Sequence, residues 1–372
     1  MRLIAIDGPP GTGKTTTIIR DAGKWSSRSA VVTYTRDAAG VLEQRAPGIQ
    51  SGTIYSLTWP YVRAYTKGVT RGFRSAGGYR ERRVAHLMDP ALEQYVQDAP
   101  SRQKQTLDKD LALVLHAWDG DGKPPFDLDD ASPKGELRYL LPLARWVADG
   151  CPMPEEQKLE TIAIDEAQDM SALEIRGALG LLQEGGMAYA YGDPGQAIFA
   201  HSKGVAHGAI PPAFVDADEV RLLDKGWRVG DPVASMAAAV LRSYWSRPAS
   251  AFAAEHKTIV MPWDEYSRPN RGLVLGYSRT VVAKAFRSWG LTQTAIVPSV
   301  AKSASEAVLC TGHAAKGAEA DDVYLLPWTR PGMDKLRTRN PDAIRLLYVM
   351  MTRARRRLHV PRPIMAEVRS FV

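Results

Sequence analysis

The stretch Gly8-Pro9-Pro10-Gly11-Thr12-Gly13-Lys14-Thr15 stands directly after the apolar run Leu3-Ile4-Ala5-Ile6. It reads G-x-x-x-x-G-K-T without substitution, which is the phosphate-loop pattern when a strand precedes it and a helix follows. Glycines let the backbone wrap a phosphate chain, so that N–H groups and the N-terminus of the next helix face the anion. We expect Lys14 to reach the β and γ phosphates and the Thr15 hydroxyl to help hold Mg²⁺. The stretch therefore predicts a nucleoside-triphosphate site, whose contacts are Gly8, Pro9, Pro10, Gly11, Thr12, Gly13, Lys14, Thr15 and Thr16.

Composition places few limits on the 372-residue chain, which is 45% hydrophobic and 24% charged, as globular proteins usually are. The length predicts two domains, or two plus an insertion. The 48 Lys and Arg residues against 41 Asp and Glu residues give a net charge of +7, which favours an anionic partner such as nucleic acid. A plain basic protein would carry the same charge. The two cysteines, Cys151 and Cys310, supply neither a disulfide framework nor metal-ligand spacing, which fits a reducing compartment.

Short apolar segments rich in Val, Ile and Leu alternate with helical stretches along the chain. This alternation predicts an α/β fold whose parallel sheets are covered on both faces. Ligands of such sheets lie at the C-terminal ends of the strands, where several of these segments meet polar motifs. The expected strands are Leu3–Asp7, Ala30–Thr35, Thr161–Asp165, Met187–Gly192, Gly272–Tyr277, Ala307–Thr311, Val323–Pro327 and Leu358–Val360.

The region from about residue 58 to 160 has helical periodicity broken by Gly and Pro clusters, which predicts an inserted, mostly helical subdomain. We expect a first domain of residues 1–60 and 155–220, an insertion of residues 61–154, and a second domain of residues 221–372. The start of the insertion, Tyr61–Arg83, interleaves seven cations with aromatic residues. This pattern suits a nucleic-acid strand, with Arg63 as one phosphate contact, because cations pair with phosphates and aromatics stack on bases. A solvated basic surface whose aromatics face the core is the alternative.

The run Asp165-Glu166-Ala167-Gln168-Asp169 follows another expected strand. An aspartate at a strand end beside a phosphate loop binds Mg²⁺, usually through water. The next carboxylate, on Glu166, is placed to orient or deprotonate an attacking water. Taken alone, the run also fits an acidic helix start. Together with the phosphate loop it predicts hydrolysis of a nucleoside triphosphate with Mg²⁺, in which Thr15 and Asp165 hold the metal.

Further blocks of sequence follow in a fixed order. Thr33–Ala39 reads T-Y-T-R-D-A-A, Gly52–Leu57 reads G-T-I-Y-S-L, and Gly192–Phe199 reads G-D-P-G-Q-A-I-F. Gly226-Trp227-Arg228 comes next, and Thr311–Glu319 and Arg345–Ala354 read T-G-H-A-A-K-G-A-E and R-L-L-Y-V-M-M-T-R-A. With the phosphate loop and Asp165–Asp169, these blocks resemble the motifs of a superfamily 1 DNA helicase of the UvrD/Rep/PcrA type over nearly the whole chain.

The resemblance implies roles for five residues at the nucleotide. Gln196 would sense the γ phosphate, Arg228 would contact it, and Arg353 would be the arginine finger. Trp227 would stack on the base and Glu319 would contact the ribose. Singly, Trp227 also fits a core position, and Arg353 also fits a solvated basic helix end.

The resemblance also implies contacts with single-stranded DNA from the blocks Thr33–Ala39 and Gly52–Leu57 and from the block that begins at Thr311. His313 has the alternative of an ordinary surface histidine. His201 aligns with a tryptophan that stacks on DNA bases in the family, and histidine stacks more weakly. The implied DNA-binding residues are Thr33, Tyr34, Thr53, Tyr55, Ser56, His201, Thr311 and His313.

By this resemblance we expect two RecA-like P-loop domains that hydrolyse ATP between them and move 3′ to 5′ on single-stranded DNA. The partners would be single-stranded DNA and single-strand/double-strand junctions, with an unidentified protein partner left open and no membrane contact. We expect a cytoplasmic location in a bacterial or phage-infected cell. The family's upstream glutamine motif and its second large accessory subdomain have no counterpart, so adenine preference and unwinding stay open. A protein-displacing translocase and an ATP-gated DNA-binding scaffold are the alternatives.

Overall fold

The computed structural model describes residues 1–33, 36–70, 143, 146–147, 150–198, 210–248, 251–263, 267–289 and 307–371. The described chain forms two compact units. One unit comprises residues 1–6, 15–192 and 199–221, and the other comprises residues 7–14, 193–198 and 222–372. The phosphate loop up to Lys14 therefore belongs to the same unit as the C-terminal part of the chain.

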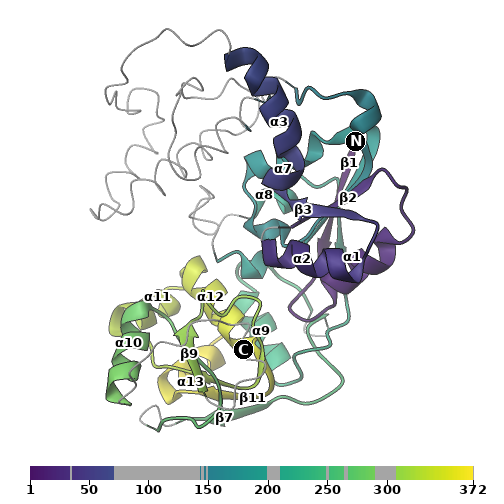
Figure 1. The fold of residues 1–372 in the computed structure, drawn as a ribbon. Coiled ribbons are helices and arrows are strands. Elements are labelled where there is room, and N and C mark those ends of the chain that lie inside the picture. The colour runs from purple at the N-terminus through teal and green to yellow at the C-terminus, as the bar shows by residue number, and fades with distance from the viewer. Residues whose placement is uncertain are drawn as a thin grey trace, which may run out of the picture. The chain divides into compact units, whose positions relative to one another are not determined.

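The first unit is built on a six-stranded sheet in the order β3-β2-β4-β5-β1-β6. Figure 1 labels its strands β1, β2 and β3. β2 pairs in parallel with β3 and β4, and β4 pairs in parallel with β5. The inner strands are buried along nearly their whole length because helices cover both faces of such a sheet. The strands are β1 (Arg2–Asp7), β2 (Ser29–Thr33), β3 (Gln50–Thr53), β4 (Leu159–Ile164), β5 (Leu182–Gly192) and β6 (Glu219–Leu222).

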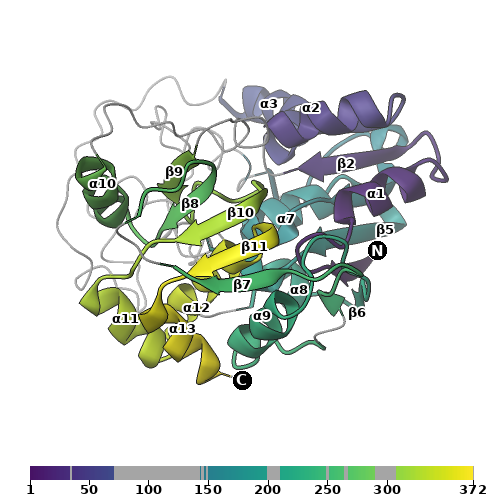
Figure 2. The ribbon, with the colours of Figure 1, turned by 90° about the horizontal axis from the view of Figure 1, so that it is seen from below.

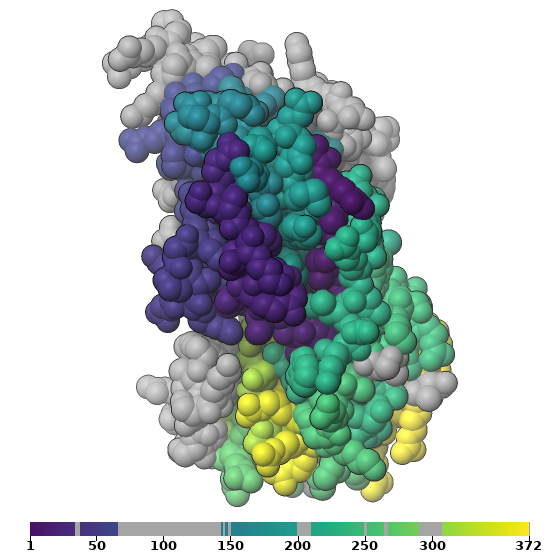
Figure 3. All heavy atoms as spheres, turned by 90° about the vertical axis from the view of Figure 1, so that its right-hand side faces the viewer, coloured from purple at the N-terminus to yellow at the C-terminus, as the bar shows by residue number. Residues whose placement is uncertain are grey.

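Helices of the first unit are α1 (Lys14–Ala22), α2 (Arg36–Arg45), α3 (Ile54–Thr70), α7 (Ala172–Leu179) and the short α8 (Pro212–Val215). α2 packs on β2 and β3, whereas α3 packs on β3 and α7. α7 begins with a capping box, in which the Ser171 side chain accepts from the Glu174 N–H and the Glu174 carboxylate accepts from the Ser171 N–H. In the space-filling view, the start of the chain (purple) and the residues after 150 (teal) lie side by side in this unit (Figure 3).

The second unit contains a five-stranded parallel sheet in the order β7-β11-β10-β8-β9 (Figure 2). α10 packs over β8 and β9 around a buried cluster that includes Trp263, Val274, Leu309 and Leu326. The strands are β7 (Ile259–Pro262), β8 (Gly272–Gly276), β9 (Ala307–Thr311), β10 (Ala320–Leu325) and β11 (Ala354–Val360).

The helices of this unit are α9 (Val233–Leu241), α10 (Arg279–Ser288), α11 (Arg330–Arg337), α12 (Pro341–Met351) and α13 (Arg362–Arg369). α12 is buried from Ala343 to Met351 because it packs against α9, α11 and β10. It begins at an Asn340 side chain that accepts a hydrogen bond from the Ala343 N–H. α12 is thus a rigid support for the polar side chains that it carries.

The predicted α/β fold with two parallel sheets is confirmed. All eight expected strands are present, with bounds that differ by a few residues. β3, β6 and β7 were not predicted, because each has only four residues. β6 and β7 are largely exposed and β3 has the polar sequence Q-S-G-T, so all three lack the apolar run that marks a buried strand. Apart from α3 and a few residues near 143–150, the predicted helical insertion lies outside the described residues, as do Arg71 and the later cations of the basic stretch.

Candidate nucleotide and nucleic-acid site

The phosphate loop joins the end of β1, at Asp7, to the start of α1, at Lys14. Gly11 and Gly13 have φ angles of 79° and 78°, a left-handed conformation that favours glycine. The Thr12 hydroxyl donates to the Pro9 carbonyl at 2.9 Å, which closes the loop on itself. The left-handed backbone at Gly11 and Gly13 curves the loop, as the sequence pattern predicts.

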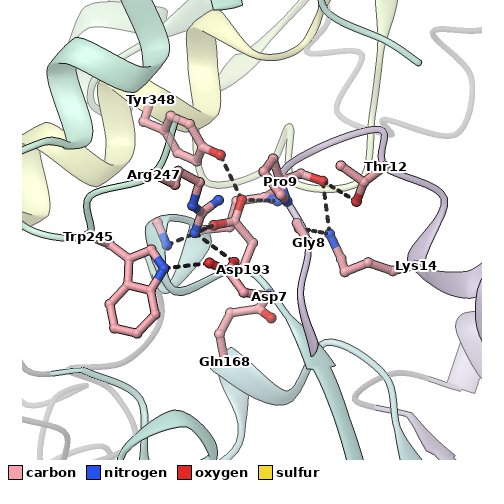
Figure 4. Close-up of polar contacts among 12 residues, drawn as sticks. Asp7, Gly8, Pro9, Thr12, Lys14, Gln168, Asp193, Trp245, Arg247 and Tyr348 are labelled. Atoms are coloured by element: carbon pink, nitrogen blue, oxygen red, sulfur yellow. Dashed lines mark hydrogen bonds and ion pairs between the residues drawn. The ribbon is translucent and has the colours of Figure 1, made fainter. Parts of the chain in front are cut away.

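The Lys14 side chain folds back along the loop (Figure 4). Its ammonium donates to the Gly8 carbonyl at 2.6 Å and to the Pro9 carbonyl at 3.4 Å. A Cβ atom at position 8 would lie 2.7 Å from Cγ of Lys14, so this path for the lysine requires glycine. The arrangement places one buried cation among the backbone groups of the loop, where a phosphate would compete with the carbonyls for it.

Thr15, the residue after Lys14, meets the carboxylate of Asp165 in the first unit. The Thr15 hydroxyl donates to Oδ2 of Asp165 at 3.1 Å, and Oδ1 of Asp165 accepts from the Glu166 N–H at 3.0 Å. A hydroxyl and a carboxylate oxygen at this separation fit Mg²⁺, which takes one or two protein oxygens and completes its octahedron with phosphate and water. No group of three or more His, Cys, Asp and Glu side chains that could hold a metal occurs in the described ranges. A magnesium ion here would thus depend on the nucleotide for further ligands.

Glu166 has a left-handed backbone, with φ 56° and ψ 39°. Such a conformation is uncommon for a residue with a Cβ atom and costs on the order of 1–3 kcal/mol. The Gln168 amide donates to the Glu166 carboxylate, and Gln168 itself is buried. The strained turn and the glutamine together fix the direction of a carboxylate that directly follows Asp165.

A buried ion cluster lies beside the phosphate loop within the second unit (Figure 4). Arg247 contacts Oδ1 of Asp193 and Oδ1 of Asp7, each at 2.9 Å. The Trp245 indole N–H donates to the other Asp7 oxygen at 2.6 Å, and the Tyr348 hydroxyl donates to Oδ2 of Asp193 at 2.8 Å. Sequence reasoning missed Trp245, Arg247 and Tyr348 as parts of the site.

Burial and neighbouring charges shift the pKa values of Asp7 and Asp193 in opposite directions. Burial, only partly offset by Arg247 and the Trp245 hydrogen bond, raises the pKa of Asp7 to about 6. Burial alone would also raise the pKa of Asp193, but Arg247, Lys14 and the hydrogen bonds from Tyr348 and Gln196 together lower it. Asp193 therefore carries a full negative charge at neutral pH.

Gln196 lies three residues after Asp193 and links it to Arg353, which follows α12. Its amide N–H donates to Oδ2 of Asp193 at 2.8 Å, and its carbonyl oxygen accepts from Nη2 of Arg353 at 2.9 Å. Arg353 is 1% exposed and also donates to the backbone carbonyls of Val349 and Ala318. The structure thus brings the predicted sensor and the predicted finger into direct contact, with the guanidinium buried among carbonyls.

Arg228 packs against the loop and pairs with Glu319. A Cβ atom at Gly11 would lie 2.3 Å from Cβ of Arg228, and the Gly11 carbonyl accepts from the Trp227 N–H at 2.9 Å. Nε of Arg228 lies 2.6 Å from the Glu319 carboxylate. Trp227 is 59% exposed, so it is not a core residue, and Lys225 lies 4.1 Å from the centre of its ring. All three residues expected at base, ribose and γ phosphate therefore lie close to the loop or to one another.

The pattern that defines the AAA domain family matches residues 1–202, which are more than half of the chain. The chain belongs to the AAA domain family. The matched range contains the phosphate loop, Asp165, Glu166 and Gln196, so the family extends over most of the site in this AAA domain protein. The finer assignment to the UvrD/Rep/PcrA type stays a prediction.

Three solved structures resemble this AAA domain protein at low identity. The helicase nonstructural protein 10 of an arterivirus has 14% identity and a TM-score of 0.44, over 100% of this chain and 62% of that one. The PRRSV helicase has 15% identity and a TM-score of 0.41, over 97% of this chain and 52% of that one. The arterivirus protein in complex with DNA has 14% identity and a TM-score of 0.43, over 99% and 63%. The chain thus spans less than two thirds of these helicases, and the comparison with curated proteins gives no match.

The predicted DNA-binding residues of this AAA domain protein fall into separate places. In the first unit Thr33 is buried at the end of β2, whereas Arg63 on α3 is exposed. The Thr53 and Ser56 hydroxyls lie 3.3 Å apart at the start of α3, and the Tyr55 hydroxyl donates to Glu174 at 2.9 Å. In the second unit, the half-buried Thr311 and His313 lie at the end of β9. Tyr34 and His201 lie outside the described residues.

In the parts of the chain that the structure describes, no helix has both the length and the apolar composition of a membrane span.

Proposed function

We propose that this AAA domain protein is an ATP-dependent DNA helicase or translocase that moves 3′ to 5′ on single-stranded DNA. One observation carries the nucleotide chemistry: a complete phosphate loop ends in Thr15, whose hydroxyl lies 3.1 Å from the Asp165 carboxylate. Loop, lysine, hydroxyl and strand-end carboxylate are the parts that phosphoryl transfer requires.

Each residue of this set has a distinct task in the proposed reaction. Lys14 exchanges its loop carbonyls for phosphate oxygens and offsets the charge that develops on the γ phosphate. Thr15 and Asp165 hold Mg²⁺, which neutralises phosphate charge and orients the transferring group. Glu166, held by Gln168, accepts the proton of the attacking water.

The remaining predicted residues belong to the second unit. Gln196 and Arg353 act as a pair, with the amide as sensor and the guanidinium as donor to the transferring group. Arg228 supplies a further cation, and Trp227 and Glu319 contact the base and the ribose. Because several of these side chains contact one another, the loss of one disturbs its neighbour.

Single-stranded DNA is the proposed partner, contacted by Thr33, Tyr34, Thr53, Tyr55, Ser56, Arg63, His201, Thr311 and His313. The net charge of +7 supports an anionic partner. Junctions, a protein partner and the direction of movement belong to the proposal on the strength of the sequence resemblance alone.

ATP turnover with and without single-stranded DNA tests the proposal. We expect DNA to raise turnover many-fold in the wild-type protein and Lys14→Ala to abolish it. A turnover rate that DNA leaves unchanged would remove the motor. Strand displacement from substrates with 3′ or 5′ tails, run beside streptavidin displacement, then separates a helicase from a protein-displacing translocase and fixes the direction.

An ATP-gated DNA-binding scaffold is the second candidate, and one observation favours it. Arg228 is paired with Glu319, and Arg353 is bound to Gln196 and to carbonyls, so neither predicted cation is held open for phosphate. A scaffold binds ATP and changes its DNA affinity without steady turnover. Measurable DNA-stimulated hydrolysis in the wild-type protein excludes this candidate.

A further inference from the structure

A hollow of about 1160 Å³ opens at one edge of the five-stranded sheet of the second unit. It lies where β7, β8 and β10 begin, whereas Thr311 and His313 lie where β9 ends. Parallel strands begin at one edge of a sheet and end at the other. The hollow is therefore separate from the DNA contacts predicted for this unit.

The lining of the hollow has a surplus of cations. Five basic side chains face three carboxylates, and His256 adds an imidazole. The basic residues are Lys257, Arg271, Arg355, Arg356 and Arg357, and the acidic residues are Glu319, Asp321 and Asp322.

Close ion pairs occupy only part of this set. Arg357 binds the buried Asp322 through two nitrogens, one of them at 2.7 Å, and Arg355 lies 2.9 Å from Asp321. Arg271 and Arg356 are 72% and 76% exposed in their side chains, and their nearest carboxylate contacts are 3.9 and 3.7 Å long. Exposed pairs at such distances hold their partners weakly. Arg271 and Arg356, with the exposed Lys257, therefore have N–H donors to offer a ligand.

The chemistry of the lining selects phosphate over bases. Base recognition in single strands uses aromatic stacking platforms. Within the described part of the chain, no aromatic side chain lines the hollow apart from the His256 imidazole, whose ring nitrogen contacts the Arg355 carbonyl at 2.8 Å. Arginine forks match phosphate oxygens in geometry and charge.

We propose that this hollow binds the phosphate backbone of a nucleic-acid strand through Arg271, Arg356 and Lys257. The inference rests on the proposed function only in taking nucleic acid as the partner. Binding here is independent of base sequence and falls steeply with salt.

Fluorescence anisotropy with a labelled oligodeoxythymidylate, measured over a salt series, tests the assignment. The double variant Arg271→Ala/Arg356→Ala is compared with the wild-type protein. The matched control is Arg362→Ala/Arg369→Ala, which removes the same charge from exposed positions on α13. We expect the slope of log K against log salt to become flatter by roughly 0.7 for each arginine lost from the hollow, hence by roughly 1.4, and to keep its wild-type value in the control.

Three further measurements test whether the ligand of the hollow is a nucleic-acid backbone, free phosphate or an acidic protein segment. Arg271→Lys/Arg356→Lys keeps both charges and should keep the slope. Inorganic phosphate that displaces the oligonucleotide better than chloride at equal ionic strength would show a site for free phosphate and overturn the assignment. Polyglutamate that displaces it as well as unlabelled oligonucleotide does, at equal charge, would overturn it in favour of an acidic protein segment.

The failures of the two proposals are distinguishable. A wild-type protein that does not bind the oligonucleotide sinks the proposed function. If the wild-type protein binds the oligonucleotide and Arg271→Ala/Arg356→Ala binds it with equal affinity and equal salt slope, only the assignment of the hollow is refuted. Thermal unfolding of both double variants shows that any loss of binding is not a loss of fold.

Discussion

Arg247 lies 2.9 Å from Oδ1 of Asp193, and the same nitrogen lies 2.9 Å from Oδ1 of Asp7. One guanidinium thereby joins the residue that precedes the phosphate loop to the residue that follows β5. The side chains of Arg247, Asp7 and Asp193 are 2%, 6% and 0% exposed, so water screens their charges very little. This contact anchors the loop within the second unit.

Removal of the cation should therefore be costly. In Arg247→Met, two buried carboxylates lose their counter-charge, and breaking a buried pair in this way costs about 3–5 kcal/mol. We expect a corresponding fall in the free energy of unfolding, measured by urea denaturation. Arg362→Met on the surface of α13 is the control, with an expected change within about 0.5 kcal/mol. Equal stability of Arg247→Met and wild type would show that the cluster contributes no net stability.

Asp7 should give the protein a specific pH dependence. Its pKa is about 6 in the folded protein against 3.8 as the ordinary value. Between these two pH values the folded state therefore binds more protons than the unfolded state. The contribution of Asp7 to the free energy of unfolding is thus highest below pH 4 and falls as the pH rises through 6. The loss amounts to about 3 kcal/mol.

The measurement compares unfolding free energies of wild type and Asp7→Asn from pH 4 to pH 8. The asparagine variant lacks the titrating group, so the difference between the two proteins should grow in favour of Asp7→Asn over this range. Asp224→Asn, at an exposed position, should follow the wild-type curve. A difference between wild type and Asp7→Asn that does not change with pH would contradict the raised pKa.

The features that could be predicted from the sequence are those formed by residues close together in the chain. The phosphate loop and the buried strands are continuous segments, so their patterns could be recognised without a structure. The ion cluster could not be predicted in this way, because Asp7, Asp193, Arg247 and Tyr348 are far apart in the sequence and only folding brings them together. Likewise, nothing local to Arg353 or Gln196 shows that their side chains meet. The role of each motif was predicted residue by residue, but the contacts between motifs were not, apart from the meeting of Thr15 with Asp165.

The close approach of Gly11 to Arg228 predicts a large effect of a small substitution. A left-handed backbone costs a non-glycine residue about 1–2 kcal/mol, and in Gly11→Ala the new Cβ atom would also lie 2.3 Å from Cβ of Arg228. Gly48→Ala is the matched control, because Gly48 has φ 95° but no atom within 4 Å of the position of a Cβ. We expect Gly11→Ala to lose more stability than Gly48→Ala, and to raise the KM for ATP, which Gly48→Ala leaves unchanged. Equal effects of the two on both readouts would contradict the packing of Arg228 on the loop.

The contact of Gln196 with Arg353 predicts that the two residues act as one unit in turnover. Arg353→Ala should lower kcat more than it raises KM, because a finger acts on the transition state. It should also destabilise the fold by about 1–3 kcal/mol, since buried carbonyls lose their donor. After Gln196→Ala, the further loss of Arg353 should change kcat little, because the partner that positions the guanidinium is already gone. Arg345→Ala provides the control. Arg345 lies on α12, which ends two residues before Arg353, is also 1% exposed and donates to the Ala197 carbonyl at 3.3 Å. The effect of Arg345→Ala on kcat should add to that of Gln196→Ala. If the effects of Arg353→Ala and Gln196→Ala on kcat were also additive, the hydrogen bond between Gln196 and Arg353 would have no part in catalysis.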